Sequence, residues 1–445
     1  MPVAKLLLTM SVPMMISMLV QALYNIVDSM FVAKLSENAL TAVSLAFPVQ
    51  NLMIAVGTGT GVGINALVSR ALGEKKNEYA NSAVNNGIYL AIFSFIGFAI
   101  VCGFFAPAFF SVQTDDPQIL AYGVDYVRVI GIMSFGLFIQ LCAEKLLQST
   151  GKTIYSMATQ LIGAVINIIL DPIMIFGLFG FPRMEVTGAA LATVTGQIIA
   201  AVIGVIMNIK LNKELHISLV KYKLNGEVIR HIYSVGFPSI IMASVGSVMT
   251  FGMNKILMGF TSTATAVFGV YFKLQSFIFM PVFGLNNGLV PIAAYNYGAR
   301  KPDRITKAIK LSITYGVCIM LAGFAVFQLF PGALLGIFSA SDDMLAIGIP
   351  ALRIISLSFL IAGFSVVASS VFQALGHGFL SLAVSVLRQL IVLLPAAFIL
   401  AKVGGLGACW WAFPIAEVFS GAVCFIFIRY TFKKEIHPLY ENAGK

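Results

Sequence analysis

Long apolar segments recur along this chain of 445 residues, and they constrain its fold more than any other feature. A helix that crosses the ~30 Å hydrocarbon layer of a membrane needs about 20 apolar residues. Only 10% of the residues are charged, whereas soluble proteins carry about 25%. The expected fold is therefore an all-α polytopic membrane protein with twelve transmembrane helices. The predicted spans are Leu8–Val32, Leu40–Val68, Ala83–Phe110, Leu120–Gln148, Ile154–Phe179, Thr187–Leu211, Ile232–Phe260, Thr265–Tyr295, Ile305–Phe330, Met344–Phe372, Leu380–Ala401 and Gly407–Phe432.

The distribution of basic residues predicts the orientation of these spans. When the loops are assigned alternately to the two sides, 20 of the 28 Lys and Arg residues fall on one side and 3 on the other. Basic loops stay in the cytoplasm, so both termini are expected there, in a multi-pass protein of the plasma (inner) membrane. The net charge of +10 then reflects membrane topology, and no nucleic-acid partner is expected.

The two halves of the chain share uncommon residues at a shift of 225. Because each half has six spans, the repeat is parallel, with a pseudo-two-fold axis along the membrane normal. Two such bundles predict a central cavity and alternating access, whereas a channel or a receptor does not need the duplication. The matched pairs are Pro13 with Pro238, Gly63 with Gly288, Gly73 with Gly298, Arg128 with Arg353, Gln148 with Gln373, and Gly151 with Gly376.

This repeat predicts the domain boundaries. The expected parts are an N-terminal lobe (residues 1–211), a cytoplasmic linker (212–231), a C-terminal lobe (232–432) and a cytoplasmic tail (433–445).

Two acidic residues lie within predicted spans of the first half. Asp28 follows Gln21, Tyr24 and Asn25 at helical spacings of three and four, so the four side chains share one face. Ionisable residues inside a membrane are costly, which makes each a candidate for a functional site.

The second acid, Asp171, follows Asn167 by four residues and precedes Pro172. No Lys or Arg lies at a similar depth in this half. Burial therefore favours bound protons on Asp28 and Asp171, or the oxygens of this region could hold Na⁺. The alternative is that both acids only hydrogen-bond to neighbouring helices.

The spans of the second half contain a different set of ionisable residues: Lys255, Lys273, Arg388 and Glu417. They could form an ion-pair network that fixes helix packing, in which Glu417 neutralises Arg388 or Lys273. They could instead bind an anionic group in a substrate cavity.

Other motifs narrow the function classes. Pro13 begins the first span and either bends it during a cycle or gives it a static kink. The chain has no phosphate-binding glycine loop with its lysine, no metal-binding cluster and no nucleophile triad, so it is not expected to be an enzyme or to carry a cofactor. Its five cysteines lie in apolar runs and are interpreted as packing residues.

Several motifs together resemble the multidrug and toxic compound extrusion (MATE) family over essentially the whole chain, and especially its bacterial branch with an aspartate in the first span. The similar segments are residues 21–32 (QALYNIVDSMFV), 148–152 (QSTGK), 167–172 (NIILDP), 188–193 (GAALAT), 284–291 (GLNNGLVP) and 295–300 (YNYGAR).

The resemblance implies two six-helix lobes and export of small amphipathic, often cationic, compounds in exchange for H⁺ or Na⁺. It implies a cation site at Asp28, Asp171, Asn167 and Thr193, which would also be the Na⁺ site. It further implicates Gln21 and Tyr24 in the transport cycle, together with bending at Pro13. A second-lobe cation site with a glutamate in the seventh span, as in other branches, is not expected, because that span carries Lys255.

Two other functions remain open. A flippase for lipid-linked precursors has a related architecture, and the basic residues of the second half are compatible with it. A receptor or an assembly scaffold would need large soluble loops, which this sequence lacks. The expected partners are small substrates and the lipid bilayer, and the expected state is a monomer.

Overall fold

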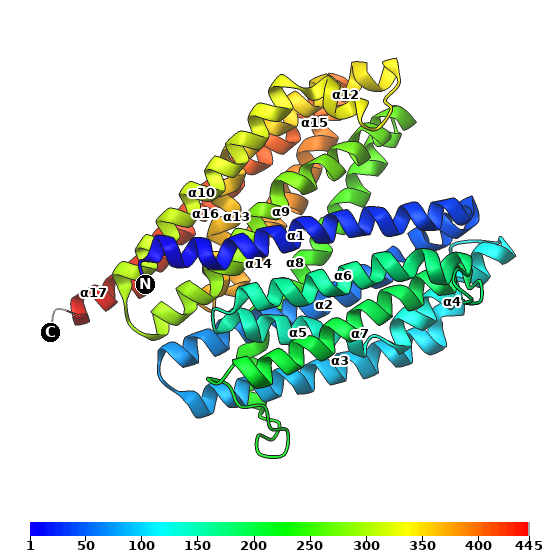
Figure 1. Cartoon of the computed structure of the whole chain (residues 1–445). Helices are drawn as coiled ribbons and strands as arrows, with labels where there is room; N and C mark the ends of the chain where they lie inside the picture. The colour runs from blue at the N-terminus through cyan, green and yellow to red at the C-terminus, as the bar shows by residue number, and fades with distance from the viewer. Residues whose placement is uncertain (444–445) are drawn as a thin grey trace. The chain divides into compact units, whose positions relative to one another are not determined.

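The structure, a computed structural model, describes residues 1–443, which form helices joined by short connections (Figure 1). Two segments, η1 (Leu387–Leu393) and η2 (Phe432–Ile436), are π-helical. The α-helices are α1 (Val3–Leu35), α2 (Glu37–Gly73), α3 (Asn77–Ser111), α4 (Pro117–Ile132), α5 (Phe135–Ser149), α6 (Thr153–Phe176), α7 (Glu185–Leu211), α8 (Gly226–Met258), α9 (Ser262–Gly298), α10 (Pro302–Leu329), α11 (Pro331–Gly336), α12 (Asp342–Ser356), α13 (Phe359–Ala374), α14 (Gly378–Val386), α15 (Leu394–Cys409), α16 (Ala412–Thr431) and α17 (His437–Ala443).

The number of membrane-spanning elements agrees with the sequence. Within residues 1–443, ten helices are long and apolar enough to cross a bilayer, and two bent pairs, α4 with α5 and α12 with α13, raise the number to twelve. The prediction of an all-α polytopic membrane protein is confirmed.

The two bent pairs differ from the continuous spans that were predicted. The chain turns by 46° between Ile132 and Phe135 and by 52° between Ser356 and Phe359. Neither break contains a proline, so the apolar pattern gave no sign of either. After the first bend, a Cβ added at Gly136 would lie 2.9 Å from the backbone nitrogen of Ile198, so α5 packs directly on the backbone of α7.

The chain forms two compact units. The N-terminal unit is Ile16–Gly236, and the C-terminal unit contains Met1–Met15 and the chain from Phe237 onwards. The divisions therefore fall inside α1 and α8 and not in a loop. The linker predicted at residues 212–231 is helical from Gly226, and the predicted tail begins within η2, its last two residues lying outside the described part of the chain.

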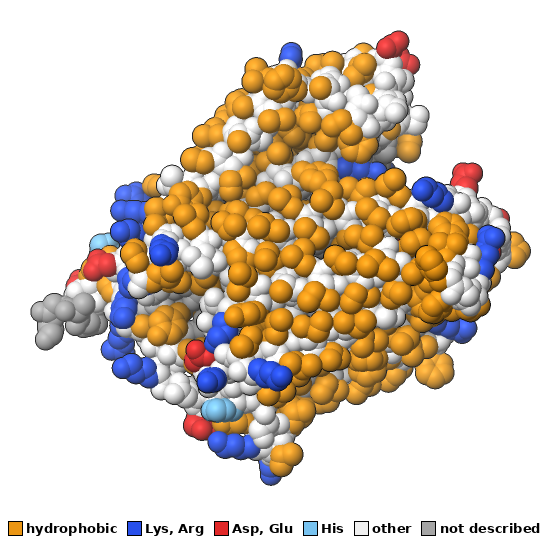
Figure 2. Space-filling model, in the orientation of Figure 1, with side chains coloured by type: hydrophobic (Ala, Val, Ile, Leu, Met, Phe, Trp, Pro, Cys, Tyr) orange, Lys and Arg blue, Asp and Glu red, His pale blue; other side chains and the backbone are white. Residues whose placement is uncertain are grey.

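Aromatic and branched side chains fill the interior of the N-terminal unit, including Ile64, Phe110, Tyr126 and Phe138. Its outer face is also hydrophobic: Figure 2 shows hydrophobic side chains covering the visible sides of α3, α6 and α7. Such a surface suits lipid as its solvent.

Arg128 of α4 does not pair with Asp125, which lies three residues earlier on the same helix. Its Nε instead donates to the Gly103 carbonyl oxygen at 3.2 Å, and no ion pair joins these two residues in the described structure.

Candidate functional site

The polar centre of the N-terminal unit begins where α6 and α7 make close backbone contact. A Cβ added at Gly196 of α7 would lie 2.6 Å from the Gly163 carbonyl oxygen of α6. Only glycine fits at this distance, and its small volume lets the two helices approach closely. The approach brings the polar residues of α6 next to Thr193 of α7.

Asn167 is the centre of this contact. Its Nδ2 donates to Thr193 Oγ1 at 3.2 Å and to Asp171 Oδ1 at 3.4 Å, one turn further along α6. All three residues are buried, and Asp171 is 0% exposed. The pairing fixes the amide of Asn167, so that its oxygen points away from both partners.

Asp28 reaches the same centre from α1. Its carboxyl group lies within hydrogen-bond reach of Asp171. Asp28 Oδ1, Asp171 Oδ2 and Asn167 Oδ1 are buried oxygens with no hydrogen-bond partner among the described residues. Burying a polar atom without a partner is costly, so these three oxygens form a set that a proton or a small cation would satisfy.

Chemically, this set suits a hard monovalent cation. Two carboxylates that lie together repel when both are charged, and a proton or a cation between them removes the repulsion. No group of three or more His, Cys, Asp and Glu side chains that could hold a metal ion occurs within residues 1–443, and the acids of this set are two, Asp28 and Asp171. Pro172 continues α6 but has no N–H, so the Ile168 carbonyl receives no helical hydrogen bond from it.

The other predicted polar residues of α1 divide into two groups. Gln21 accepts a hydrogen bond from Gln160 Nε2 of α6 at 3.2 Å, and Tyr24 lies close enough to Asp28 and Asp171 to interact with both electrostatically. Asn25 is exposed. The shared polar face therefore places Gln21, Tyr24 and Asp28 near α6, whereas Asn25 lies at its edge.

Sequence reasoning missed Tyr126 of α4. This side chain is buried close to Asp28, Tyr24 and Asp171, and its hydroxyl donates to Gln50 Oε1 at 3.5 Å. A tyrosine in an apolar span is common, so nothing in its spacing marked it. Only the packing of α4 against the polar centre reveals that Tyr126 lies there.

The C-terminal unit holds the predicted pair of opposite charges. Arg388 Nη1 lies 3.5 Å from Glu417 Oε2, and the Glu417 side chain is only 7% exposed. Buried Tyr271 lies near both, and Glu417 Oε1 has no hydrogen-bond partner among the described residues. Arg388 belongs to η1, and π-helical turns are frequent at functional sites. The sequence left Arg388 and Lys273 as alternative partners of Glu417, and Glu417 pairs with Arg388.

The remaining predicted residues lie apart from this pair. Lys273 is exposed and its Nζ is 5.9 Å from the centre of the Phe338 ring, and Lys255 is also exposed. Pro13 lies inside α1, close to its division between the units, and α1 continues through it. The five cysteines are free thiols, and four of them are buried.

A family model described as MatE matches residues 13–173 and again residues 238–399. The chain belongs to the MatE family. The two matched segments begin at Pro13 and Pro238, which is the shift of 225 residues that the sequence indicated. The resemblance to MATE transporters is therefore confirmed.

Relatives of this MatE protein match most of its length. It is 28% identical over 444 residues to the multidrug export protein MepA of Staphylococcus haemolyticus, covering 97% of this chain and 94% of that protein. It is 27% identical over 419 residues to MepA of Staphylococcus aureus (strain MSSA476), covering 94% and 91%.

Solved structures agree with these relatives. An outward-facing multidrug resistance MATE family transporter of the MOP superfamily superposes with a TM-score of 0.92 at 26% identity, covering 99% of this chain and 97% of that one. A MOP superfamily transporter from Pyrococcus furiosus, described as having a binding pocket of reverse polarity, superposes with a TM-score of 0.89 at 25% identity and the same coverage.

Proposed function

We propose that this MatE protein is a secondary active exporter of small amphipathic, often cationic, compounds, driven by exchange with H⁺ or Na⁺. The observation that carries the proposal is the set of three unpartnered buried oxygens on Asp28, Asp171 and Asn167. Related proteins bear the name multidrug export protein, which supports the same substrate class here.

In the proposed cycle, a cation and the exported compound favour different states of an alternating-access transporter. A cation that enters from outside binds Asp28 and Asp171, with the oxygens of Asn167 and Thr193 as further ligands. Coupling follows from the different affinities of the two states for each ligand, and no other energy source is needed.

The proposal includes the topology and the assembly. The termini, the linker and the tail lie in the cytoplasm of a plasma-membrane protein, and the working unit is a monomer with lobes at residues 1–211 and 232–432. Modification of single cysteines by impermeant reagents tests the topology, and the mass of the protein in nanodiscs tests the monomer.

The central experiment measures transport in proteoliposomes with H⁺ and Na⁺ gradients imposed separately. A cationic dye should move against its gradient when the coupling ion is supplied, and Asp28→Asn should abolish that movement while the protein still inserts. Asp125→Asn, which changes an exposed acid of α4 in the same unit, should retain normal transport. Normal efflux by Asp28→Asn would reject the assignment.

A second candidate function is a flippase for lipid-linked precursors. The exposed Lys255 and Lys273 of the C-terminal unit favour it, because they could bind an anionic group. The same proteoliposomes should then translocate a fluorescent anionic lipid analogue in preference to the cationic dye. Transport of the dye alone excludes this candidate.

A further inference from the structure

The connection between α7 and α8, residues 212–225 (the α7–α8 loop), is held on the side of α3 by buried asparagines. Asn81 Oδ1 accepts a hydrogen bond from the His216 N–H at 2.9 Å, and Asn85 Oδ1 accepts one from the Ser218 N–H at 2.8 Å. Asn85 Nδ2 also donates to the His216 carbonyl oxygen at 2.9 Å. These asparagine amides hydrogen-bond to backbone N–H and C=O groups of the loop, as the backbone of a neighbouring β-strand would.

Two further contacts extend the attachment in both directions. Asn86 Oδ1 accepts from the Asn225 N–H at 2.9 Å, and the Tyr89 hydroxyl donates to the Leu219 carbonyl oxygen at 2.6 Å. The loop is therefore fixed along just over two turns of α3, and its tip, residues 219–221, is held at the level of Tyr89.

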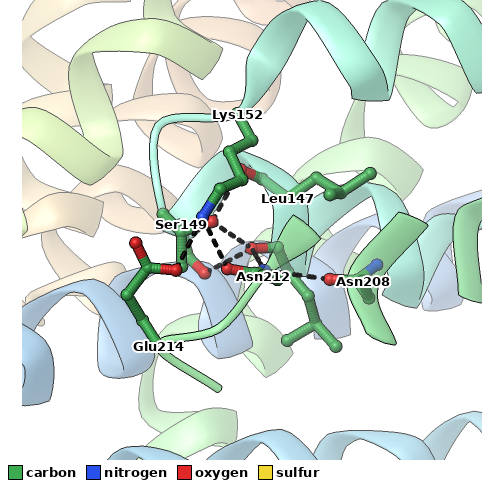
Figure 3. A network of polar contacts seen from close by, with 8 residues as sticks. Leu147, Ser149, Lys152, Asn208, Asn212 and Glu214 are labelled. Carbon is green, nitrogen blue, oxygen red and sulfur yellow. Dashed lines mark hydrogen bonds and ion pairs between the residues drawn. The ribbon is translucent and has the colours of Figure 1, made fainter. Parts of the chain in front are cut away.

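The start of the loop is fixed as well, by the polar network in Figure 3. Lys152 Nζ binds Glu214 Oε2 at 2.6 Å and Asn212 Oδ1 at 3.2 Å. Asn212 Nδ2 donates to Asn208 Oδ1 at 3.0 Å. The loop is thus anchored at its beginning, and its tip has a defined position on the N-terminal unit.

That position can be compared with the lipid-facing part of α3. The helix has 35 residues, and at 1.5 Å per residue it is ~50 Å long, well beyond the ~30 Å of hydrocarbon. Its exposed large apolar side chains begin at Phe93, ~6 Å along the axis from Tyr89. Tyrosine is also typical of the membrane–water interface, which would place the tip at the level of the lipid headgroups.

The side chains at the tip have the composition of an interfacial anchor. Val220 is 91% exposed, Leu224 is 49% and Leu219 is 38%, although each is apolar. In Figures 1 and 2 the loop projects sideways with charged and hydrophobic side chains together at its end. The exposed lysines of the loop are Lys213, Lys221 and Lys223, with Lys210 at the end of α7, and Lys221 pairs with Glu78 at 3.4 Å.

We propose that the α7–α8 loop is a lipid-binding element, whose tip inserts Leu219 and Val220 into the headgroup layer while its lysines bind anionic phospholipids. Exposed apolar groups flanked by lysine favour this environment over water. The loop lies on the lysine-rich side of the membrane, where the leaflet would carry the anionic lipid. The inference depends on membrane insertion and not on the proposed substrate or coupling ion.

The test places an environment-sensitive fluorophore at Val220→Cys, in a Cys318→Ser background that removes the exposed native thiol. The protein is reconstituted in phosphatidylcholine vesicles with or without phosphatidylglycerol. A spin label on the lipid headgroups should quench the fluorophore at position 220 several-fold more than the same fluorophore attached at position 75. Lys75 lies in the turn before α3, away from the tip of the loop. The difference should increase with phosphatidylglycerol.

A double variant tests the role of the lysines. Lys213→Gln with Lys223→Gln should lower apparent affinity for phosphatidylglycerol by about fivefold for each lysine, with unchanged elution in gel filtration. The matched control is Lys307→Gln with Lys310→Gln, two exposed lysines of α10, which should leave quenching at position 220 unaltered. Equal quenching at positions 220 and 75, or quenching at 220 that ignores phosphatidylglycerol, would overturn the proposal.

Discussion

Thr193 makes one side-chain hydrogen bond in the proposed cation site, where its oxygen is also a proposed ligand. Its hydroxyl accepts from Asn167 Nδ2, and Thr193→Val keeps the shape of the side chain but removes this oxygen. A hydrogen bond between membrane helices contributes ~0.6 kcal/mol on average, so the half-saturating concentration of the coupling ion should rise at least about threefold. Titration of transport rate against the ion gives this value.

Thr195→Val provides the control for that change. Thr195 lies on the same helix, two residues away and on a different face. Its replacement should leave the half-saturating concentration unchanged. An equal effect of both substitutions would mean that Thr193 acts only through the packing of α7.

At the scale of the elements, the contact between α6 and α7 positions the whole polar centre. Gly196→Ala should separate the helices, because the new Cβ would lie 2.6 Å from a backbone oxygen that cannot move alone. The expected loss of stability is about 1–3 kcal/mol, typical of overpacking, and coupling should weaken as Asn167 moves away from Thr193. Thermal unfolding and dye transport measure the two effects.

Gly97→Ala is the matched substitution for this helix contact. Gly97 lies in α3 of the same unit, and an added Cβ there meets no atom within 4 Å. Stability and transport should both be preserved. If Gly196→Ala behaved in the same way, the close approach of α6 and α7 would not determine the site.

The attachment of the α7–α8 loop predicts a dependence on pH. Burial raises the pKa of Glu214, but hydrogen bonds from Lys152 and from a backbone N–H outweigh it and leave the pKa below its usual value. A lowered pKa stabilises the fold above the unfolded value of about 4.3 and loses that effect as the pH falls through the folded value. The side chain is 54% exposed, so the effect is small.

Glu214→Gln should therefore lower the melting temperature slightly at pH 7, and the difference from the unchanged protein should shrink as the pH falls below about 4.3 through the lowered pKa. Melting curves in detergent at several pH values measure it. Glu441→Gln, at an exposed acid of α17, serves as the reference. A difference that stays constant with pH would show that Lys152 does not act through the charge of Glu214.

For the whole molecule, α1 and α8 are the helices that pass from one unit to the other. Each contains a proline close to the division, Pro13 and Pro238, and a proline makes a helix easier to bend. Pro13→Ala with Pro238→Ala should slow transport, while stabilisation by the coupling ion persists because its proposed ligands all belong to the N-terminal unit. Pro302→Ala, at the start of α10, should change neither.

Transport rates and ion-dependent melting temperatures in the same preparation separate these effects. Loss of the ion-dependent stabilisation in the double proline variant would contradict the expectation. Unchanged transport would assign both prolines to static kinks.

Much of this architecture follows from the sequence, because apolar length, rare-residue spacing and intramembrane charge are local signals. They predicted the spans, the repeat and a pairing of Glu417 with Arg388 or Lys273, and the resemblance gathered Asn167, Asp171 and Thr193 with Asp28. The bends at residues 132–135 and 356–359 were missed because no proline marks them.

Contacts distant in sequence account for the other differences. In the sequence, the three asparagines of α3 look like ordinary polar residues near the start of a helix, because their partners are backbone atoms more than 130 residues away. They are Asn81, Asn85 and Asn86. Tyr126 was overlooked for the same reason. Arg128 of α4 donates a hydrogen bond to the Gly103 carbonyl oxygen of α3 instead of pairing with Asp125 on its own helix.

The matching bends in α4–α5 and α12–α13 show that the two halves share backbone geometry as well as rare residues such as Pro13 with Pro238. Their intramembrane acids differ. The acids Asp28 and Asp171 have no counterpart at the shift of 225, where Met253 and Ala396 stand. One scaffold therefore carries two chemically different polar centres, an acidic one in the N-terminal unit and an Arg388–Glu417 pair in the C-terminal unit.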